Sequence, residues 1–235
     1  MADLSSSSLI ISAPPCTGTE ADCRFEQELR QLRQQVLDLA EQVHTDLLTG
    51  LYNYRYFQEA LPREMERTLR TGHPLSLMVL DIDRFKAFND RWGHEAGNQA
   101  LGHIGKLIQE SLRKLDVACR YGGEEFVVIL PDTDLRQAVL VAERLRVHIE
   151  TGVFHIDEYP LTVTVSIGID TFQYHQNDSM ATLMARADEW MYQAKREGRN
   201  RIAHPPVENI FNNYVSMDEK SALFDSFDPQ TSESN

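Results

Sequence analysis

Two groups of acidic residues have the types and spacing that a metal site would need. Asp81 and Asp83 follow the apolar run at 75–80, and in an extended chain residues two apart point to the same side. Residues 122–125 are two glycines, which let a ligand approach the backbone closely, followed by two glutamates. Mg²⁺ prefers oxygen ligands and commonly uses one or two carboxylates with substrate phosphates. Solvated acids in ordinary turns are the alternative, but two such groups at strand edges favour a metal–nucleotide site.

A mixed α/β pattern over residues 46–204 would supply the elements that hold these acids. The continuous apolar run at 75–81 predicts a strand covered on both faces, and alternation at 161–169 predicts a half-buried strand. Residues 117–120 and 126–130 flank the glycine pair and predict a hairpin. Apolar residues spaced three and four apart predict helices over 57–69, 101–115, 135–149 and 183–194.

The order of these elements is β-α-β-β-α-β after one helix, which is the ferredoxin-like split arrangement. We therefore expect an α/β (α+β) fold, a ferredoxin-like palm with an antiparallel Gly-Gly-Glu-Glu-Phe hairpin. Before it, residues 22–45 carry apolar side chains spaced 4, 3, 4, 3 and 4 apart, which favours a coiled-coil stalk over a helix lying on its own domain. The residues of this seam are Phe25, Leu29, Leu32, Val36, Leu39 and Val43.

Composition and charge narrow the classes of protein further. The chain has 235 residues, 42% hydrophobic and 25% charged, which is typical of one soluble domain with appendages. Its net charge of −13 argues against a nucleic-acid coat, and no apolar run reaches the length of about 18 residues that a membrane span needs. No basic residue precedes the short apolar run at 9–11, so we expect no signal peptide. Three scattered cysteines predict reduced thiols in the cytoplasm.

Both ends of the chain differ from the centre. Residues 1–21 are rich in serine and predict disorder, and residues 205–235 carry six acids and one base among several aromatic residues. We therefore divide the chain into a disordered N-terminus (1–21), a stalk (22–45), a catalytic domain (46–204) and an acidic, partly apolar tail (205–235).

Residues 122–126, Gly-Gly-Glu-Glu-Phe, resemble the signature of the GGDEF family, the diguanylate cyclases, in its GGEEF form. The resemblance extends to residues 46–51, 81–90, 92–97, 166–168 and 187–200, and covers about 46–204. A short stalk without a receiver domain is similar to the layout of SiaD-type cyclases. The resemblance implies condensation of two GTP into cyclic di-GMP with release of pyrophosphate, by two domains that face each other and each hold one GTP.

The resemblance also implies roles for individual residues, with Mg²⁺ as the cofactor and Mn²⁺ as its alternative. Glu125 would bind a second metal or help deprotonate the attacking 3′-hydroxyl, and Arg120 would face the developing charge. The metal ligands would be Asp81, the Ile82 carbonyl, Glu124 and Glu125. The substrate contacts would be Lys86, Lys195 and Arg199 at the phosphates, Gly122 and Gly123 at the turn, and Asn89 and Asn98 at guanine. His94 lies between the last two and would be either a further guanine-side contact or a packed loop histidine. For the cations, the alternative is surface charges paired with neighbouring acids.

Two further expectations concern specificity and feedback. The family usually has Asp where this chain has Asn98, and an amide offers guanine one acceptor and one donor instead of two acceptors. If Asn98 faced elsewhere, we would expect it to cap the helix that runs to Leu115.

Arg113 and Asp116 match the family's RxxD inhibitory site for cyclic di-GMP, with Arg144 at its accessory position. The alternative is a helix-end Arg with a capping Asp.

Two rival functions stay open. One is a catalytically degenerate domain that binds cyclic di-GMP or another nucleotide and only signals, which Asn98 favours and the intact residues 122–126 oppose. The other is a scaffold whose stalk and tail bind a partner. For the enzyme, we expect a homodimer or higher oligomer formed through the stalk, and a regulatory protein that binds the stalk or tail.

Overall fold

The computed structural model describes residues 27–33, 44–176 and 178–206, which fall into two units, Met1–His44 and Thr45–Asn235. In the first unit, residues 27–33 are helical, as the stalk pattern predicts. The rest of the predicted stalk up to residue 43, residues 1–21 and most of the tail lie outside the described residues. None of the helices within the described ranges is long and apolar enough to cross a membrane.

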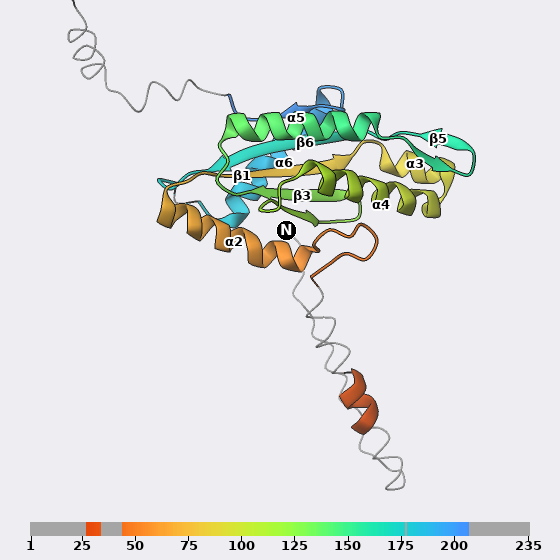
Figure 1. Cartoon of the computed structure of the whole chain (residues 1–235), viewed down its shortest axis with the longest axis horizontal. Coiled ribbons are helices and arrows are strands. Elements are labelled where there is room, and N and C mark those ends of the chain that lie inside the picture. Colours follow the sequence, from red (N-terminus) through yellow and green to blue (C-terminus); the bar gives the residue numbers. More distant parts are fainter. Residues whose placement is uncertain (1–26, 34–43, 177, 207–235) are drawn as a thin grey trace, which may run out of the picture. The chain divides into compact units, whose positions relative to one another are not determined.

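The second unit is built on a five-stranded sheet with strand order β2-β3-β1-β6-β7 (Figure 1). Strand β1 is central and pairs antiparallel with β3 and with β6, while β7 adds a short parallel edge to β6. The first four positions of this order are those of the ferredoxin-like arrangement, so the predicted fold is confirmed. The strands are β1 (Leu75–Ile82), β2 (Val117–Arg120), β3 (Glu125–Leu130), β6 (Val165–Phe172) and β7 (Ile202–Ala203).

Helices cover both faces of the sheet, because β1 and β3 alternate their apolar side chains between two cores. Helices α4 (His94–Ser111) and α5 (Leu135–Thr151) pack on the face that carries Met78 and Leu80. Helices α2 (Tyr54–Thr71) and α6 (Met180–Arg196) pack on the face that carries Leu77 and Val79. A strand between two such layers is buried on both sides, which explains the continuous apolar run of β1.

The last long strand departs from its predicted burial. Strand β6 begins at Val165 and is buried along its whole length, so the expectation of a half-buried strand over 161–169 was wrong. A Cβ atom built on Gly168 would lie 2.1 Å from the Ala187 carbonyl oxygen and from the Met191 amide nitrogen. The glycine therefore lets the backbone of α6 lie directly on the sheet, and its neighbours on that face are buried under the helix.

Two other elements differ from the pattern in the sequence. Helix α4 ends at Ser111 rather than near Leu115, because the Asp116 carboxylate accepts the Arg113 amide at 2.9 Å and closes a turn there. A two-stranded hairpin, β4 (Phe154–Ile156) and β5 (Tyr159–Leu161), lies between α5 and β6. It takes up Leu161, the first residue of the segment in which a single strand was expected.

Cys119 lies in β2 beneath the α2 side of the sheet and is a free thiol. Burial raises the pKa of this thiol to about 12, which keeps it protonated and unreactive near neutral pH. This agrees with the reduced thiol expected from the sequence.

Candidate active site

The predicted acids meet at the edge of the sheet where β1 ends and β3 begins. In the register of these strands Asp81 lies opposite Glu125, and the Ile82 amide donates to the Glu124 carbonyl at 3.3 Å. Antiparallel pairing therefore brings together residues that are more than forty positions apart in the sequence. The side chains of Asp81, Glu124 and Glu125 share one electrostatic environment, since Asp81 raises the pKa of both glutamates and Glu125 raises that of Glu124.

Burial is the main reason why the pKa of each of these carboxyl groups is raised. For Asp81, the raised pKa is partly offset by Lys195, whose Nζ lies 2.8 Å from Oδ2, and is increased by Asp83 and Asp188. For Glu124 and Glu125, the negative charge of Asp81 raises the pKa further, and Lys195 again opposes the rise. A cation bound here would relieve this repulsion, so the donor set fits a hard divalent metal.

The protein does not preform a complete cage for such an ion. In the parts of the chain that the structure describes, no three His, Cys, Asp or Glu side chains are gathered as ligands of one metal. This fits Mg²⁺, which usually keeps one or two protein carboxylates and completes its shell with phosphates and water. Lys195 supplies a positive charge at the same place. It forms an ion pair with Asp81 and not with an unrelated surface acid, which was the alternative for this lysine.

The two acids of the first group have different surroundings. Asp83 lies beyond the end of β1, and its carboxylate accepts hydrogen bonds from Thr164 Oγ1 at 2.7 Å, Ser166 Oγ at 2.6 Å and the Asn200 amide at 2.9 Å. The extended geometry assumed from the spacing thus stops at Ile82. Asp188, on α6, was missed among the candidate residues, although it is close enough to raise the pKa of both Asp81 and Glu125.

Arg120 stabilises the glycine turn through hydrogen bonds to its backbone carbonyl groups. Its guanidinium donates to the carbonyls of Gly122 at 3.2 Å and Gly123 at 2.8 Å, and forms an ion pair with Asp46 at 3.2 Å. A Cβ atom on Gly122 would lie 2.6 Å from Glu125 Oε2, so the glycine also makes room for the catalytic candidate. These contacts give Arg120 a supporting position, and its direct contact with the developing charge stays a prediction. The partner Asp46 was not among the candidate residues.

The residues expected near guanine lie on α3 (Phe85–Trp92) and the start of α4. Asn89 Oδ1 is buried and has no hydrogen-bond partner among the described residues, so it is an acceptor available to a ligand. A Cβ atom on Gly97 would lie 1.9 Å from it. His94 and Asn98 are exposed, and Asn98 does not cap its helix, because the cap residue is Gly93.

The remaining phosphate candidates lie on two different elements. Lys86 is exposed on α3, and Arg199 is exposed in the turn that follows α6. Arg199 has a left-handed backbone with φ 67°. The structure thus places Arg199 four residues beyond Lys195 at the same end of α6.

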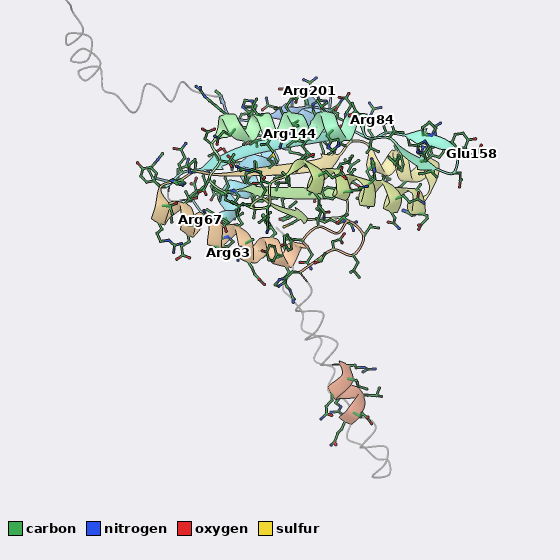
Figure 2. The ribbon with its side chains drawn as sticks, in the orientation of Figure 1. Arg63, Arg67, Arg84, Arg144, Glu158 and Arg201 are labelled. Atoms are coloured by element: carbon green, nitrogen blue, oxygen red, sulfur yellow. The ribbon has the colours of Figure 1, made fainter. Side chains whose placement is uncertain are left out.

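The predicted inhibitory residues form a separate site at the connection between α4 and β2. The Arg113 guanidinium donates to Asp116 Oδ1 at 3.2 Å and to Thr133 Oγ1 at 2.9 Å, while the Asp116 side chain is only 1% exposed. Arg144 lies on α5 (Figure 2). Its guanidinium donates to the carbonyl of Ser111, two residues before Arg113, at 2.7 Å. The three candidates therefore lie around one short segment of chain.

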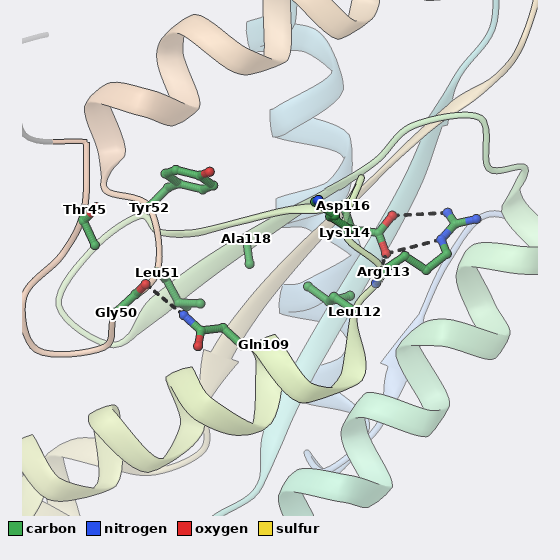
Figure 3. Close-up of a pocket in the computed structure, with 10 residues that line it drawn as sticks. All are labelled: Thr45, Gly50, Leu51, Tyr52, Gln109, Leu112, Arg113, Lys114, Asp116 and Ala118. Atoms are coloured by element: carbon green, nitrogen blue, oxygen red, sulfur yellow. Dashed lines mark hydrogen bonds and ion pairs between the residues drawn. The ribbon is translucent and has the colours of Figure 1, made fainter.

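A cavity of about 410 Å³ opens beside Arg113 and Asp116. Figure 3 shows the Arg113–Asp116 pair on one side and, on the other, Gln109, whose amide donates to the Gly50 carbonyl at 2.8 Å. The cavity lies at the end of the turn that precedes α2, away from the acids of β1 and β3. Its lining consists of Thr45, Gly50, Leu51, Tyr52, Gln109, Leu112, Arg113, Lys114, Asp116 and Ala118.

Comparison with known proteins gives consistent matches. The family model described as diguanylate cyclase, GGDEF domain, matches residues 43–201. Response regulator PleD of Caulobacter vibrioides is 41% identical over 181 residues, which are 76% of this chain and 39% of PleD. The chain thus spans well under half the length of this curated relative.

Solved structures also resemble the chain. Diguanylate cyclase SiaD of Pseudomonas aeruginosa, in complex with its activator SiaC, has a TM-score of 0.67 and 36% identity, covering 79% of this chain and 71% of that one. The coiled coil and GGDEF domain of DgcB from Caulobacter crescentus, in complex with c-di-GMP, has a TM-score of 0.66 and 30% identity, covering 79% of this chain and all of that one.

Proposed function

Because the chain belongs to the GGDEF family of diguanylate cyclases, we propose that it condenses two GTP into cyclic di-GMP and releases two pyrophosphates. The observation that carries this proposal is the register that sets Asp81 opposite Glu125, beside Lys195. Phosphoryl transfer depends on positioning and charge neutralisation more than on covalent help from the protein. An edge with three acids and a lysine fits that requirement.

Asp81, the Ile82 carbonyl and Glu124 would hold a divalent cation, Mg²⁺ in our proposal with Mn²⁺ as its alternative. Such an ion, when bound, neutralises phosphate charge. The 3′-oxygen of one GTP attacks the α-phosphorus of the other, the bond to the leaving pyrophosphate breaks, and the 3′-hydroxyl proton passes to Glu125. The raised pKa of Glu125 makes its carboxylate a stronger base than an ordinary glutamate. The reaction occurs twice, once in each direction across the facing domains.

The positive groups have a place in the same scheme. Lys195 forms an ion pair with Asp81 in the structure. Once a metal cation binds the Asp81 carboxylate instead, the Lys195 ammonium group would be released to pair with a phosphate. Lys86 and Arg199 are exposed and would bind the β- and γ-phosphates. On the base side, the Asn89 side-chain oxygen, which has no partner in the described part of the chain, would accept a hydrogen bond from guanine.

A domain that binds the nucleotide without turning it over is the second candidate, and Asn98 is the observation that favours it. An amide at this position matches guanine less well than a carboxylate. Incubating the full chain with GTP and Mg²⁺ and measuring cyclic di-GMP by mass spectrometry separates the two functions. Formation of cyclic di-GMP that Glu125→Gln abolishes supports the enzyme, whereas GTP binding without product supports the second candidate.

Regulation would act at the α4–β2 connection and through the ends of the chain. Arg113, Asp116 and Arg144 would bind cyclic di-GMP as a feedback ligand, since the exposed Arg113 offers the planar contacts that guanine and phosphate need. The stalk would join two or more copies. SiaD is described with an activator, which supports a regulatory protein that binds the stalk or the tail here. The GTP substrate is consistent with the predicted cytoplasmic location.

A further inference from the structure

The turn after α6 has an unusual backbone. Arg199 and Asn200 have φ values of 67° and 46°, and both follow Gly198, whose φ is 126°. Left-handed backbone is costly for residues that carry a Cβ, and such conformations persist where the surroundings determine them. Two adjacent residues of this kind, one of them the predicted phosphate ligand, require an explanation in their contacts.

Asp83 holds this turn from the side of the sheet. Its Oδ2 accepts the Asn200 amide at 2.9 Å, and the same carboxylate accepts the hydroxyls of Thr164 and Ser166. The Asp83 amide in turn donates to the Thr164 carbonyl at 2.9 Å. The residue therefore ties together the end of β1, the start of β6 and the turn that carries Arg199.

The Asn200 side chain is held from α5. Its Oδ1 accepts from Arg146 at 2.9 Å, and its Nδ2 donates to Glu150 Oε1 at 2.7 Å. The Arg146 side chain is only 13% exposed and is fixed by ion pairs with Glu143 and Glu150, which raise its pKa. Both the backbone and the side chain of Asn200 are thus determined by groups far away in the sequence.

The charged end of Arg199 has no partner among the residues that the structure describes. Its amide donates to the Ala194 carbonyl at 3.0 Å, which continues the end of α6, but its side chain is exposed. Within the described ranges, no ion pair or hydrogen bond is formed by its guanidinium. A fixed backbone with an uncommitted guanidinium is the arrangement expected for a group kept ready for an anionic ligand.

We propose that Asp83, Asn200 and Arg146 form a clamp that positions Arg199 for the β- and γ-phosphates of GTP. The clamp residues are positioning residues, because they act through Arg199 and do not touch the substrate. The proposal rests on the proposed function, which supplies the triphosphate ligand. It adds that affinity for the triphosphate depends on a hydrogen-bond network between β1, α5 and the turn after α6.

A double-mutant cycle tests the clamp. The variants are Asp83→Ala, Arg199→Ala and the combination, each titrated in Mg²⁺ with a GTP analogue that has a non-cleavable α,β-methylene bond. In the parent chain, Asp83→Ala should lower the affinity for the analogue about tenfold or more. In a chain that already carries Arg199→Ala, adding Asp83→Ala should change the affinity little. Affinity for GMP, measured by competition, should stay unchanged in all variants, because GMP lacks the phosphates that Arg199 would bind.

Controls separate positioning from a general loss of structure. Asp83→Asn keeps an oxygen for the Asn200 amide and should retain most of the affinity, because the Ser166 hydroxyl can accept from the new amide. If Asp83→Ala does not fold, Arg146→Leu in the same cycle replaces it. Additive losses, or equal losses for GMP and the analogue, would overturn the clamp while leaving the proposed function intact. A parent chain that does not bind the analogue would overturn the proposed function and the clamp with it.

Discussion

Glu125 is the residue at which the proposed chemistry can be tested most directly, because it is a partly buried carboxylate beside Asp81. We expect Glu125→Gln to lower the rate of cyclic di-GMP formation by about 10²–10⁴-fold, the usual contribution of a general base. Binding of the non-cleavable GTP analogue should change much less. The assay compares product formation with analogue affinity in parent and variant.

The pH dependence of the parent gives an independent check of the same role. Glu125 accepts a proton only when it is ionised, and its pKa is raised, so the rate should fall as the pH drops through a value above the ordinary glutamate range of about 4.3. A fall centred on the ordinary value, or a Glu125→Gln variant that loses affinity as much as rate, would assign Glu125 to binding alone.

Replacing Glu124 tests how much the repulsion between the acids at the ends of β1 and β3 destabilises the folded domain. A carboxyl group whose pKa is raised in the folded state binds more protons there than in the unfolded chain, so stability falls as the pH rises through that range. At pH 7 without metal, Glu124→Gln should therefore raise Tm, on the order of 1 °C for a partly exposed group. If Glu124 is a metal ligand, we also expect Mg²⁺ to raise the Tm of the parent and not that of the variant. A variant that is less stable and still responds to Mg²⁺ would contradict the metal assignment.

At the scale of single residues, the acids of the site could be predicted from the sequence, but not all of their contacts could. Asp81, Glu124 and Glu125 could be predicted because strand pattern and glycine content are local signals. The bonds from Asp83 to Thr164, Ser166 and Asn200 could not, because they join segments 81 to 117 residues apart. Asp46 and Asp188 were missed for the same reason, since each acts on a site formed by other elements.

At the scale of the elements, Gly168 controls how closely α6 approaches the sheet. An added side chain would meet the backbone of α6, which cannot move aside as a flexible side chain would. We expect Gly168→Val to lower the free energy of unfolding by about 1–3 kcal/mol or more, as overpacking in cores does. Urea denaturation measures the change, with Gly123→Ala as the control, because a Cβ there meets nothing within 4 Å. Equal stabilities of the two variants would show that α6 can shift freely.

The connection between α4 and β2 is the element through which feedback would act. Arg113→Ala should leave the initial rate intact and raise the cyclic di-GMP concentration for half-inhibition about tenfold or more, because the site lies away from the acids. Arg113→Lys is the informative companion, since a lysine cannot make the planar two-point contact. Inhibition curves that coincide with the parent's would restore the interpretation of Arg113 as a helix-end residue paired with Asp116.

Helices and strands with strong periodicity were predicted well, because each such segment contributes a regular stripe to one of the two cores. The short elements were not predicted. The β4–β5 hairpin has three residues in each strand and packs through contacts such as Phe88 with Phe154, which depend on α3. The complete burial of β6 likewise follows from the presence of α6 on its second face, and no residue of the strand alone reveals that.

At the scale of the whole molecule, the proposed reaction needs two domains, since each would supply one GTP. The rate should then depend on how often two copies meet, and a stalk that joins them raises the effective concentration, to the mM range for short links. Of the predicted seam, Leu29 and Leu32 fall in the described helical residues 27–33, where their side chains are 37% and 52% exposed. Exposed apolar side chains at seam positions are what a second copy of the stalk would bury.

We therefore expect Leu32→Glu to separate the copies and to make activity depend on enzyme concentration. A charge in an apolar seam is unfavourable, so the variant should lose activity at dilute protein and recover it at high protein concentration. Gln31→Glu introduces the same charge one position away from the seam and should behave as the parent. The measurement is specific activity against protein concentration, with mass by light scattering. A Leu32→Glu variant that is monomeric yet fully active when dilute would show that the domains meet without the stalk, and that residues 22–45 serve to attach a partner.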